Sequence, residues 1–101
     1  MRRAARIDGN HAKIVQALVA SGAKVQSLAA LGGGCPDLLV SRGGVNYLLE
    51  VKRPELQTYA PKGWPEKKRL AEQQAWRDAW RGPVKVVYSV DQALEAIGVR
   101  V

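Results

Sequence analysis

The chain has 101 residues, of which 47% are apolar, a length and composition that favour a single globular domain over residues 1–101. No apolar run approaches the ~20 residues that a membrane-spanning helix needs, so we predict no membrane span. Lys and Arg number 16 against 9 Asp and Glu, and the net charge of +7 favours a polyanionic partner such as nucleic acid, although such charge also keeps a surface soluble.

The first part of the chain predicts a basic arm, a helix and a short strand. Residues 1–8 are rich in arginine, and because no apolar segment follows them we expect no secretory signal. From Asn10 to about Ser21, Ile14, Val15, Leu18 and Val19 recur at helical spacing. Asp8 or Asn10 is the predicted cap of this helix and Gly22 its end. Residues 23–28 are β-prone, and the glycine-rich residues 31–36 predict a loop or tight bend.

Two apolar segments flank the tripeptide Arg42-Gly43-Gly44 and predict a β-hairpin. With the glycine pair at the turn, Leu39 lies opposite Leu48 and Asp37 opposite Glu50. Opposed residues place their Cβ atoms about 4.5–5.5 Å apart on one face of the sheet. Lys52 lies two residues beyond Glu50 and shares that face. Two carboxylates and one ammonium group are therefore predicted to meet at one end of the hairpin.

The second half of the chain predicts a loop, a helix, a strand and a final helix. Residues 53–66 hold three prolines and a glycine and are predicted to form an ordered or mobile loop. A helix is predicted over 67–81, with Leu70, Trp76 and Trp80 near one face, and a strand over 84–89. Ser89 and Gln92 form the predicted capping box of the last helix. The order α-β-β-β-α-β-α predicts an α/β fold, a mixed sheet with helices on its faces.

The charges at the end of the hairpin favour a metal site. Two carboxylates ~5 Å apart repel each other by about 3 kcal/mol at an effective dielectric near 20, so one is protonated or a cation lies between them. Hard oxygen ligands with open positions suit Mg²⁺ or Mn²⁺, which polarise a phosphate and lower the pKa of bound water. Lys52 can then orient that water or offset developing charge. The alternative is that Lys52 simply neutralises Glu50 in a surface ion pair.

Pro36-Asp37 followed by Glu50-Val51-Lys52 resembles the PD-(D/E)xK nuclease signature. The chain more widely resembles stand-alone, phage-type VRR-NUC domains, which are similar to Holliday junction resolvases. The stretches that carry this resemblance are DGNHAKIVQAL, GGGCPDLLV, YLLEVK, QAWRDAWRGP and VVYSVDQALEAIG. It implies a Mg²⁺- or Mn²⁺-dependent phosphodiesterase that acts on DNA without a small-molecule cofactor. It also implies that Asp37, Glu50 and the Val51 backbone carbonyl bind the metal while Lys52 assists catalysis.

The resemblance further implies a glutamine from the later helix and an acidic residue from the first helix. Gln74 matches that glutamine best, and Gln73 is the alternative because it projects closer to the face of Leu70 and Trp80. Both also read as ordinary solvated helix residues. Lys13 stands where relatives commonly carry an acid, which weakens the case for a third acidic ligand and for two metals.

Three further features have both a functional and a plain structural interpretation. His11 is a candidate metal ligand or base, but a lone histidine near a helix start is commonly a cap or surface residue. Trp64 can stack on a base, contact a partner or be buried. Cys35 has no partner for an internal disulfide, which fits a reducing cytoplasm, and we read it as a small packing residue.

Phosphate contacts are expected from the basic residues around the proline-rich loop and in the arm, and these give salt-sensitive affinity without sequence readout. The candidates are Arg53, Lys62, Lys67, Lys68, Arg69, Arg2, Arg3 and Arg6.

The leading hypothesis is a structure-selective endonuclease for branched DNA. A four-way junction has two equivalent strands, so symmetric cutting implies a homodimer. The alternatives are a non-catalytic DNA-binding module on the same fold and a nuclease subunit that needs a partner.

Overall fold

The structure, a computed structural model, describes residues 9–54 and 63–101. These residues form an α+β domain with four strands, three α-helices and one 3₁₀ turn, η1. In chain order the elements are α1 (Gly9–Ala20), β1 (Lys24–Ser27), η1 (Ala29–Leu31), β2 (Leu38–Arg42), β3 (Val45–Val51), α2 (Trp64–Ala79), β4 (Lys85–Val87) and α3 (Val90–Ala96). The sheet is mixed, in the order β1-β2-β3-β4, with β3 and β4 parallel and the other neighbours antiparallel.

The hairpin has the predicted register. Leu39 lies opposite Leu48, and the turn residues Gly43 and Gly44 both have positive φ angles, of 61° and 81°. This conformation matches the twist of the flanking strands and is open to glycine at little cost. The prediction was wrong at its open end, because the ladder stops one pair before Asp37 and Glu50. On the other edge of β2 the pairing with β1 continues to Asp37, whose carbonyl accepts a hydrogen bond from the Leu28 N–H at 2.8 Å.

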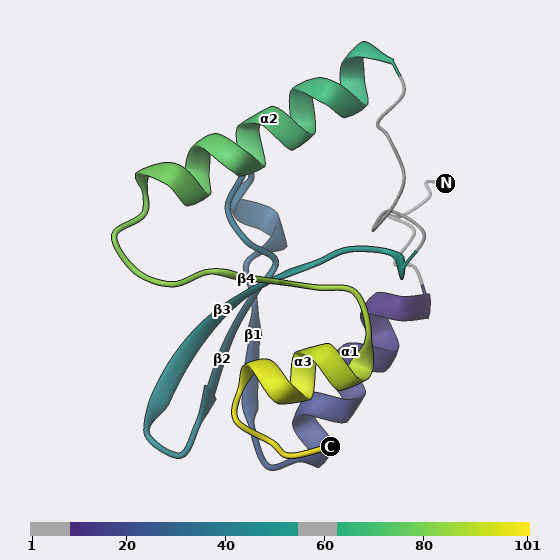
Figure 1. Cartoon of the computed structure of the whole chain (residues 1–101), viewed down its shortest axis with the longest axis vertical. Coiled ribbons are helices and arrows are strands. Elements are labelled where there is room, and N and C mark those ends of the chain that lie inside the picture. Colours follow the sequence, from purple (N-terminus) through teal and green to yellow (C-terminus); the bar gives the residue numbers. More distant parts are fainter. Residues whose placement is uncertain (1–8, 55–62) are drawn as a thin grey trace.

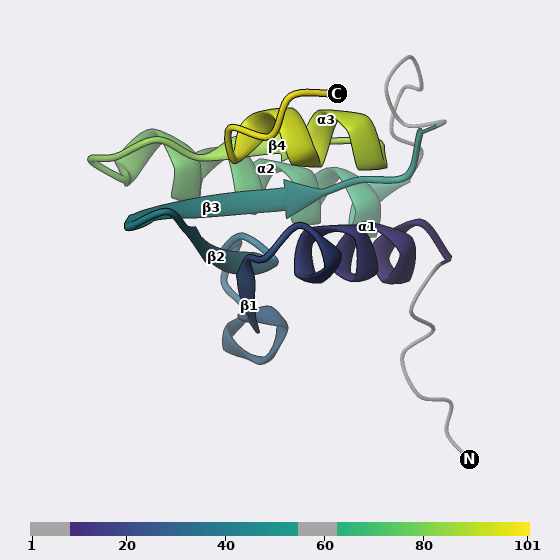
Figure 2. The same cartoon turned by 90° about the horizontal axis from the view of Figure 1, so that it is seen from below.

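The core lies between the sheet and two helices, α1 and α3, which lie side by side (Figures 1 and 2). Its buried residues are Ile14, Leu18, Ala23, Leu38, Val40, Leu49, Val87, Ala93 and Ile97. Ile14 and Leu18 confirm the predicted apolar stripe, since residues four apart share one helix face. Val19 was wrongly included and is 55% exposed, because the next residue along rotates off that face.

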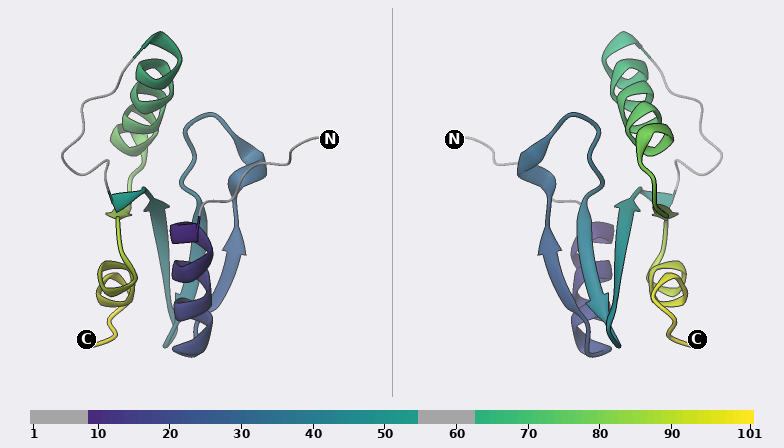
Figure 3. Two further views of the ribbon diagram at one scale, coloured as in Figure 1. Left: turned by 90° about the vertical axis from the view of Figure 1, so that its right-hand side faces the viewer. Right: turned by 90° about the vertical axis from the view of Figure 1, so that its left-hand side faces the viewer.

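Helix α2 contributes no residue to this core and lies beyond the end of the sheet at which β3 ends (Figures 1 and 3). It starts at Trp64, so the predicted loop over 53–66 and helix over 67–81 were wrong at this boundary. Pro65 causes the early start, because a proline in the first helical turn loses no hydrogen bond and has the helical φ angle already. Trp76 and Trp80 stack with ring centroids 4.5 Å apart.

Two predicted caps differ from the observed contacts. Asn10 lies inside α1, where its side chain bonds other elements. Ser89 caps α3 by accepting from the Gln92 N–H at 3.1 Å, but the Gln92 side chain accepts from the Tyr88 N–H. Gly22, with a φ angle of 96°, ends α1 as predicted. Asp8, the basic arm with Arg2, Arg3 and Arg6, and Lys62 lie outside the described residues.

No helix within residues 9–54 and 63–101 is long and apolar enough to cross a membrane.

Candidate metal centre

Asp37 and Glu50 come together at the end of the hairpin, beyond the last ladder pair. The Val51 N–H donates to Asp37 Oδ2 at 2.7 Å, which ties the Asp37 side chain to the strand that carries Glu50. Glu50 is only 2% exposed and is the single charged residue in the buried class among those described. The two acids therefore meet as predicted, although through this hydrogen bond and not as an opposed strand pair.

The Glu50 carboxyl has a strongly perturbed pKa. Burial raises the pKa of Glu50, the negative charge of Asp37 raises it further, and the result is about 7 against an ordinary 4.5. Lys52 and Arg77 act in the opposite direction without offsetting the first two causes. Mutual repulsion of two carboxylates in a water-poor site is the electrostatic situation that a bound cation relieves.

Lys52 lies beside Glu50, with its Nζ atom 3.5 Å from Glu50 Oε2. The Lys52 side chain is only 12% exposed, so this pair is not the surface ion pair that the sequence left as an alternative. The Nζ atom also donates to Gln73 Oε1 on α2. An ammonium group held by two oxygen partners in a water-poor site is a fixed positive charge.

The backbone of Lys52 is tied to its neighbours by α1 and β4. Asn10 Nδ2 donates to the Lys52 carbonyl at 2.8 Å and to the Tyr88 carbonyl at 3.2 Å. The Lys52 N–H donates to the Val87 carbonyl at 2.9 Å. The sequence pattern assigned Asn10 to a helix cap and gave no sign of this bridge, because it joins segments 42 and 78 residues apart.

Of the two candidate glutamines, the structure brings Gln73 and not Gln74 to the centre. Gln73 contacts Lys52, whereas Gln74 bonds Asp78 at 2.8 Å and Arg77 at 3.0 Å along α2. The family likeness had favoured Gln74. Adjacent helix positions differ by about 100° around the axis, so only one of the two can face the carboxylates.

Gly34 sets how closely α2 approaches the loop before Asp37. A Cβ atom at Gly34 would lie 2.7 Å from the carbonyl carbon of Glu72 and 3.1 Å from the Gln73 backbone nitrogen. No rotamer change can relieve such contacts, because the atoms belong to the helix backbone. The absence of a side chain at Gly34 therefore lets Gln73 reach Lys52.

Replacing Gly34 with alanine is expected to displace α2 while the core stays folded. All three tryptophans lie between Trp64 and Trp80, in α2 or directly after it, so tryptophan fluorescence reports this segment alone. We expect red-shifted emission and a loss of stability about 1–3 kcal/mol beyond the cost of the left-handed backbone. Gly33→Ala is the matched control, because Gly33 also has a positive φ angle but open space around it. Equal spectra for both variants would refute the role of Gly34.

Arg77 is a residue near the centre that the sequence interpretation missed. Its positive charge acts on Glu50, and it follows Gln73 by four residues on α2. Residues four apart share a helix face, so once Gln73 is placed, Arg77 follows. The sequence shows this four-residue spacing, but it does not show which face of α2 lies toward the carboxylates.

An open apolar groove of about 650 Å³ adjoins the centre, between the outer face of the sheet and α2. Leu39 and Leu48 from the sheet, Leu31 from η1, and Trp76 and Trp80 from α2 are among its lining residues. Cys35 also lines it and lies close to both acids, since burial and then the charges of Glu50 and Asp37 raise the pKa of its thiol. Residues of the sheet and of α2 therefore line this groove together.

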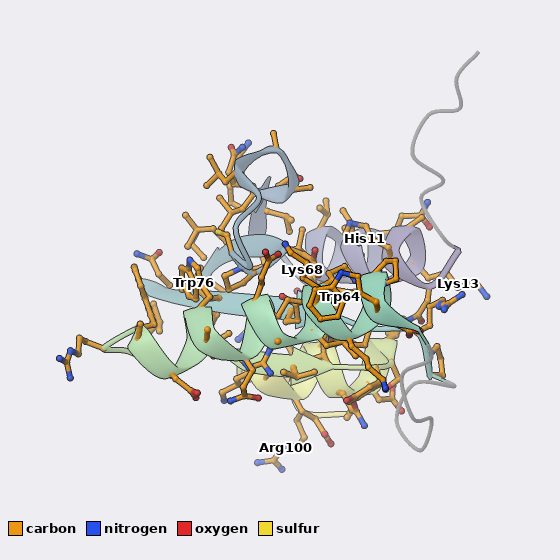
Figure 4. The ribbon with its side chains drawn as sticks, turned by 90° about the horizontal axis from the view of Figure 1, so that it is seen from above. His11, Lys13, Trp64, Lys68, Trp76 and Arg100 are labelled. Atoms are coloured by element: carbon orange, nitrogen blue, oxygen red, sulfur yellow. The ribbon has the colours of Figure 1, made fainter. Side chains whose placement is uncertain are left out.

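The other candidate ligands do not join the two acids. No group of three or more His, Cys, Asp and Glu residues able to hold a metal is found in 9–54 and 63–101. His11 lies on α1 and lines a shallow depression with Val15 and Leu38 (Figure 4). Lys13 is exposed on the same helix. Val51 meets Asp37 through its N–H, and the metal-binding role of its carbonyl stays a prediction.

Four of the predicted phosphate-binding residues lie in the described part of the chain, before and after residues 55–62 in the sequence. Arg53 is exposed after β3, and Lys67, Lys68 and Arg69 are exposed on the first half of α2. Lys68 pairs with Glu72 at 2.7 Å in a surface ion pair. Trp64, 71% exposed, and Trp76 lie toward opposite ends of this helix, with Lys68 between them (Figure 4).

Comparison with known proteins gives no relative: the chain matches no protein-family model, no curated protein and no solved structure.

Proposed function

We propose that this protein is a metal-dependent DNA endonuclease with a PD-(D/E)xK core of the VRR-NUC type. The observation that carries the proposal is the buried Glu50, whose pKa is raised to about 7 beside Asp37 and whose carboxylate lies 3.5 Å from the Lys52 ammonium. A buried acid with a perturbed pKa and a specific charged partner is typical of catalytic sites. Together with Pro36 before Asp37, these residues match the nuclease signature.

The donor set suits Mg²⁺ or Mn²⁺. Asp37 and Glu50 offer hard carboxylate oxygens, and a bound cation would relieve the repulsion between them. Oδ2 of Asp37 is engaged by Val51, so we assign Oδ1 and the Glu50 carboxylate to the ion. Two protein carboxylates are enough for Mg²⁺, which keeps several waters and binds substrate phosphate. When bound, the ion lowers the pKa of a water and polarises the phosphate.

Lys52 and Gln73 act as a unit in this proposal. Lys52 stabilises negative charge on the phosphate and orients the attacking water, while Gln73 holds the ammonium group toward Glu50. An immobilised charge stabilises a transition state better than a mobile one, because it needs no reorganisation during the reaction.

We propose branched DNA as the substrate and a homodimer as the active form. The exposed Arg53, Lys67 and Arg69 bind phosphates without reading bases, which favours recognition of shape. A four-way junction has two-fold symmetry, so two copies of the chain provide two equivalent centres. A sedimentation measurement that finds only monomer on the junction would refute the dimer.

Purified protein is expected to cut a labelled four-way junction in Mg²⁺ or Mn²⁺ and to leave it intact in EDTA. Linear duplex of the same sequence should be cut at least about tenfold more slowly. Asp37→Asn protein prepared in the same way controls for a contaminating host nuclease. Binding without cutting under all metal conditions would instead support a non-catalytic DNA-binding module. The presence of Lys13 where an acid is common favours this alternative. Cutting only after addition of host extract would identify a subunit that needs a partner.

A further inference from the structure

The Arg77 guanidinium has a buried nitrogen without a partner. Nη2 donates to Gln74 Oε1 at 3.0 Å, but Nη1 is buried and meets no acceptor; it is the one such side-chain atom among the residues that the structure describes. Buried polar groups are nearly always hydrogen-bonded, and an unpaired charged donor is especially unfavourable. A guanidinium donor left unpaired in this way is available to an oxygen acceptor that a small rotation of the side chain brings within reach.

The position of Arg77 indicates what that ligand is. Arg77 lies one turn after Gln73, whose side chain contacts Lys52, and its charge acts on Glu50. No ion pair joins Arg77 to Glu50 among the described contacts, so the guanidinium is near the carboxylates but not neutralised by them. A second cation held at the centre in this way can accept an anion there.

We propose that Arg77 binds a non-bridging oxygen of the scissile DNA phosphate. This inference rests on the endonuclease function proposed above. In that reaction a water oxygen forms a bond to phosphorus, and the bond from phosphorus to the leaving sugar oxygen breaks. The water loses one proton to solvent, and the leaving oxygen gains one. Negative charge on the non-bridging oxygens is greatest midway, when the guanidinium stabilises it most.

The chemistry of arginine favours phosphate over other acceptors. The guanidinium is planar, stays charged at all relevant pH values and presents donors in a fork that matches two phosphate oxygens. Its contact with Gln74 lies on the exposed side of α2 and stabilises the helix only slightly.

Arg77→Met and Arg81→Met form the test pair, because both remove one positive charge from the same region and Arg81 is exposed past the end of α2. Single-turnover cleavage of a labelled four-way junction is measured at saturating enzyme and saturating Mn²⁺. We expect Arg77→Met to be slower by about 100-fold or more, as for loss of one transition-state donor, and Arg81→Met to stay within about threefold of wild type. At pH 5, where Glu50 is protonated, the melting temperature of metal-free Arg77→Met should equal or exceed that of wild type, because the unpaired donor is gone.

Three results would overturn the assignment. Cleavage by Arg77→Met within threefold of wild type would exclude a phosphate contact. Recovery of the lost rate at Mn²⁺ concentrations well above the one that saturates wild type would show that Arg77 acts only through metal binding at Glu50. A lower melting temperature together with altered tryptophan fluorescence would make Arg77 a structural residue.

Failure of the endonuclease proposal is distinguishable from failure of this one. If the wild type does not cut with any metal, junction binding in Ca²⁺ still tests Arg77 as a phosphate-binding residue. Weakening of at least tenfold for Arg77→Met relative to Arg81→Met supports the contact, and equal affinities reject it.

Discussion

Replacing Asp37 with asparagine is expected to slow DNA cleavage by about 1,000-fold or more, because a metal contributes several kcal/mol of transition-state stabilisation and each 1.36 kcal/mol is a factor of ten in rate. The asparagine carbonyl can still accept the hydrogen bond that Val51 donates at 2.7 Å. Its amide group replaces the other carboxylate oxygen, so a neutral donor stands where an anionic acceptor stood. The substitution removes the metal ligand and keeps the local fold.

Asp37→Asn should therefore be inactive and at least as stable as wild type in EDTA, since Asp37, which after burial is the second cause of the raised Glu50 pKa, no longer repels that carboxylate. Urea unfolding and junction cleavage are the two measurements. Asp37→Ala is the comparison, because it leaves the Val51 N–H unsatisfied and should cost about 1–3 kcal/mol of stability. Retained cleavage by Asp37→Asn, with a rate within tenfold of wild type, would remove Asp37 from the metal site.

The hairpin could be predicted because its determinants are local. Gly43 and Gly44 provide the two positive φ angles of a tight turn, and the alternation of Leu39 and Leu48 with the core residues leaves one register that buries an apolar face. The meeting of Asp37 and Glu50 follows from that register. The exact contact could not be predicted, because the β2–β3 ladder ends before Asp37 and the Asp37 side chain accepts from the Val51 N–H.

Helix α2 was harder to predict because its packing is not encoded in an apolar stripe. None of its residues is fully buried, so hydrophobic periodicity does not identify which face meets the sheet. The close approach at Gly34 decides that Gln73 and Arg77 face the carboxylates. The proline content of residues 53–66 led to the prediction of a loop up to residue 66, whereas Pro65 lies in the first turn of α2.

Metal-free protein is expected to lose stability as pH rises from about 5 to 8, with Glu50 as the main cause. Its folded-state pKa is about 7 against 4.5 for an ordinary glutamate. Between these values the folded state keeps a proton that the unfolded state has released, so stability falls as pH rises and the contribution is gone above about 7. From the size of the shift, the contribution reaches at most about 3 kcal/mol.

Glu50→Gln should abolish this slope, because glutamine keeps the size of the side chain and carries no titrating proton. Urea unfolding in EDTA at pH 5 and pH 8 measures it for both proteins. Glu95→Gln is the control, since Glu95 is exposed on α3 and its replacement removes the same charge. Mn²⁺ should stabilise wild type more at pH 8 than at pH 5, because the ion needs the ionised carboxylate, and should not stabilise Glu50→Gln at either pH. Parallel pH profiles for wild type and Glu50→Gln would show that Glu50 does not titrate in this window, and the electrostatic argument for a bound cation would then fail.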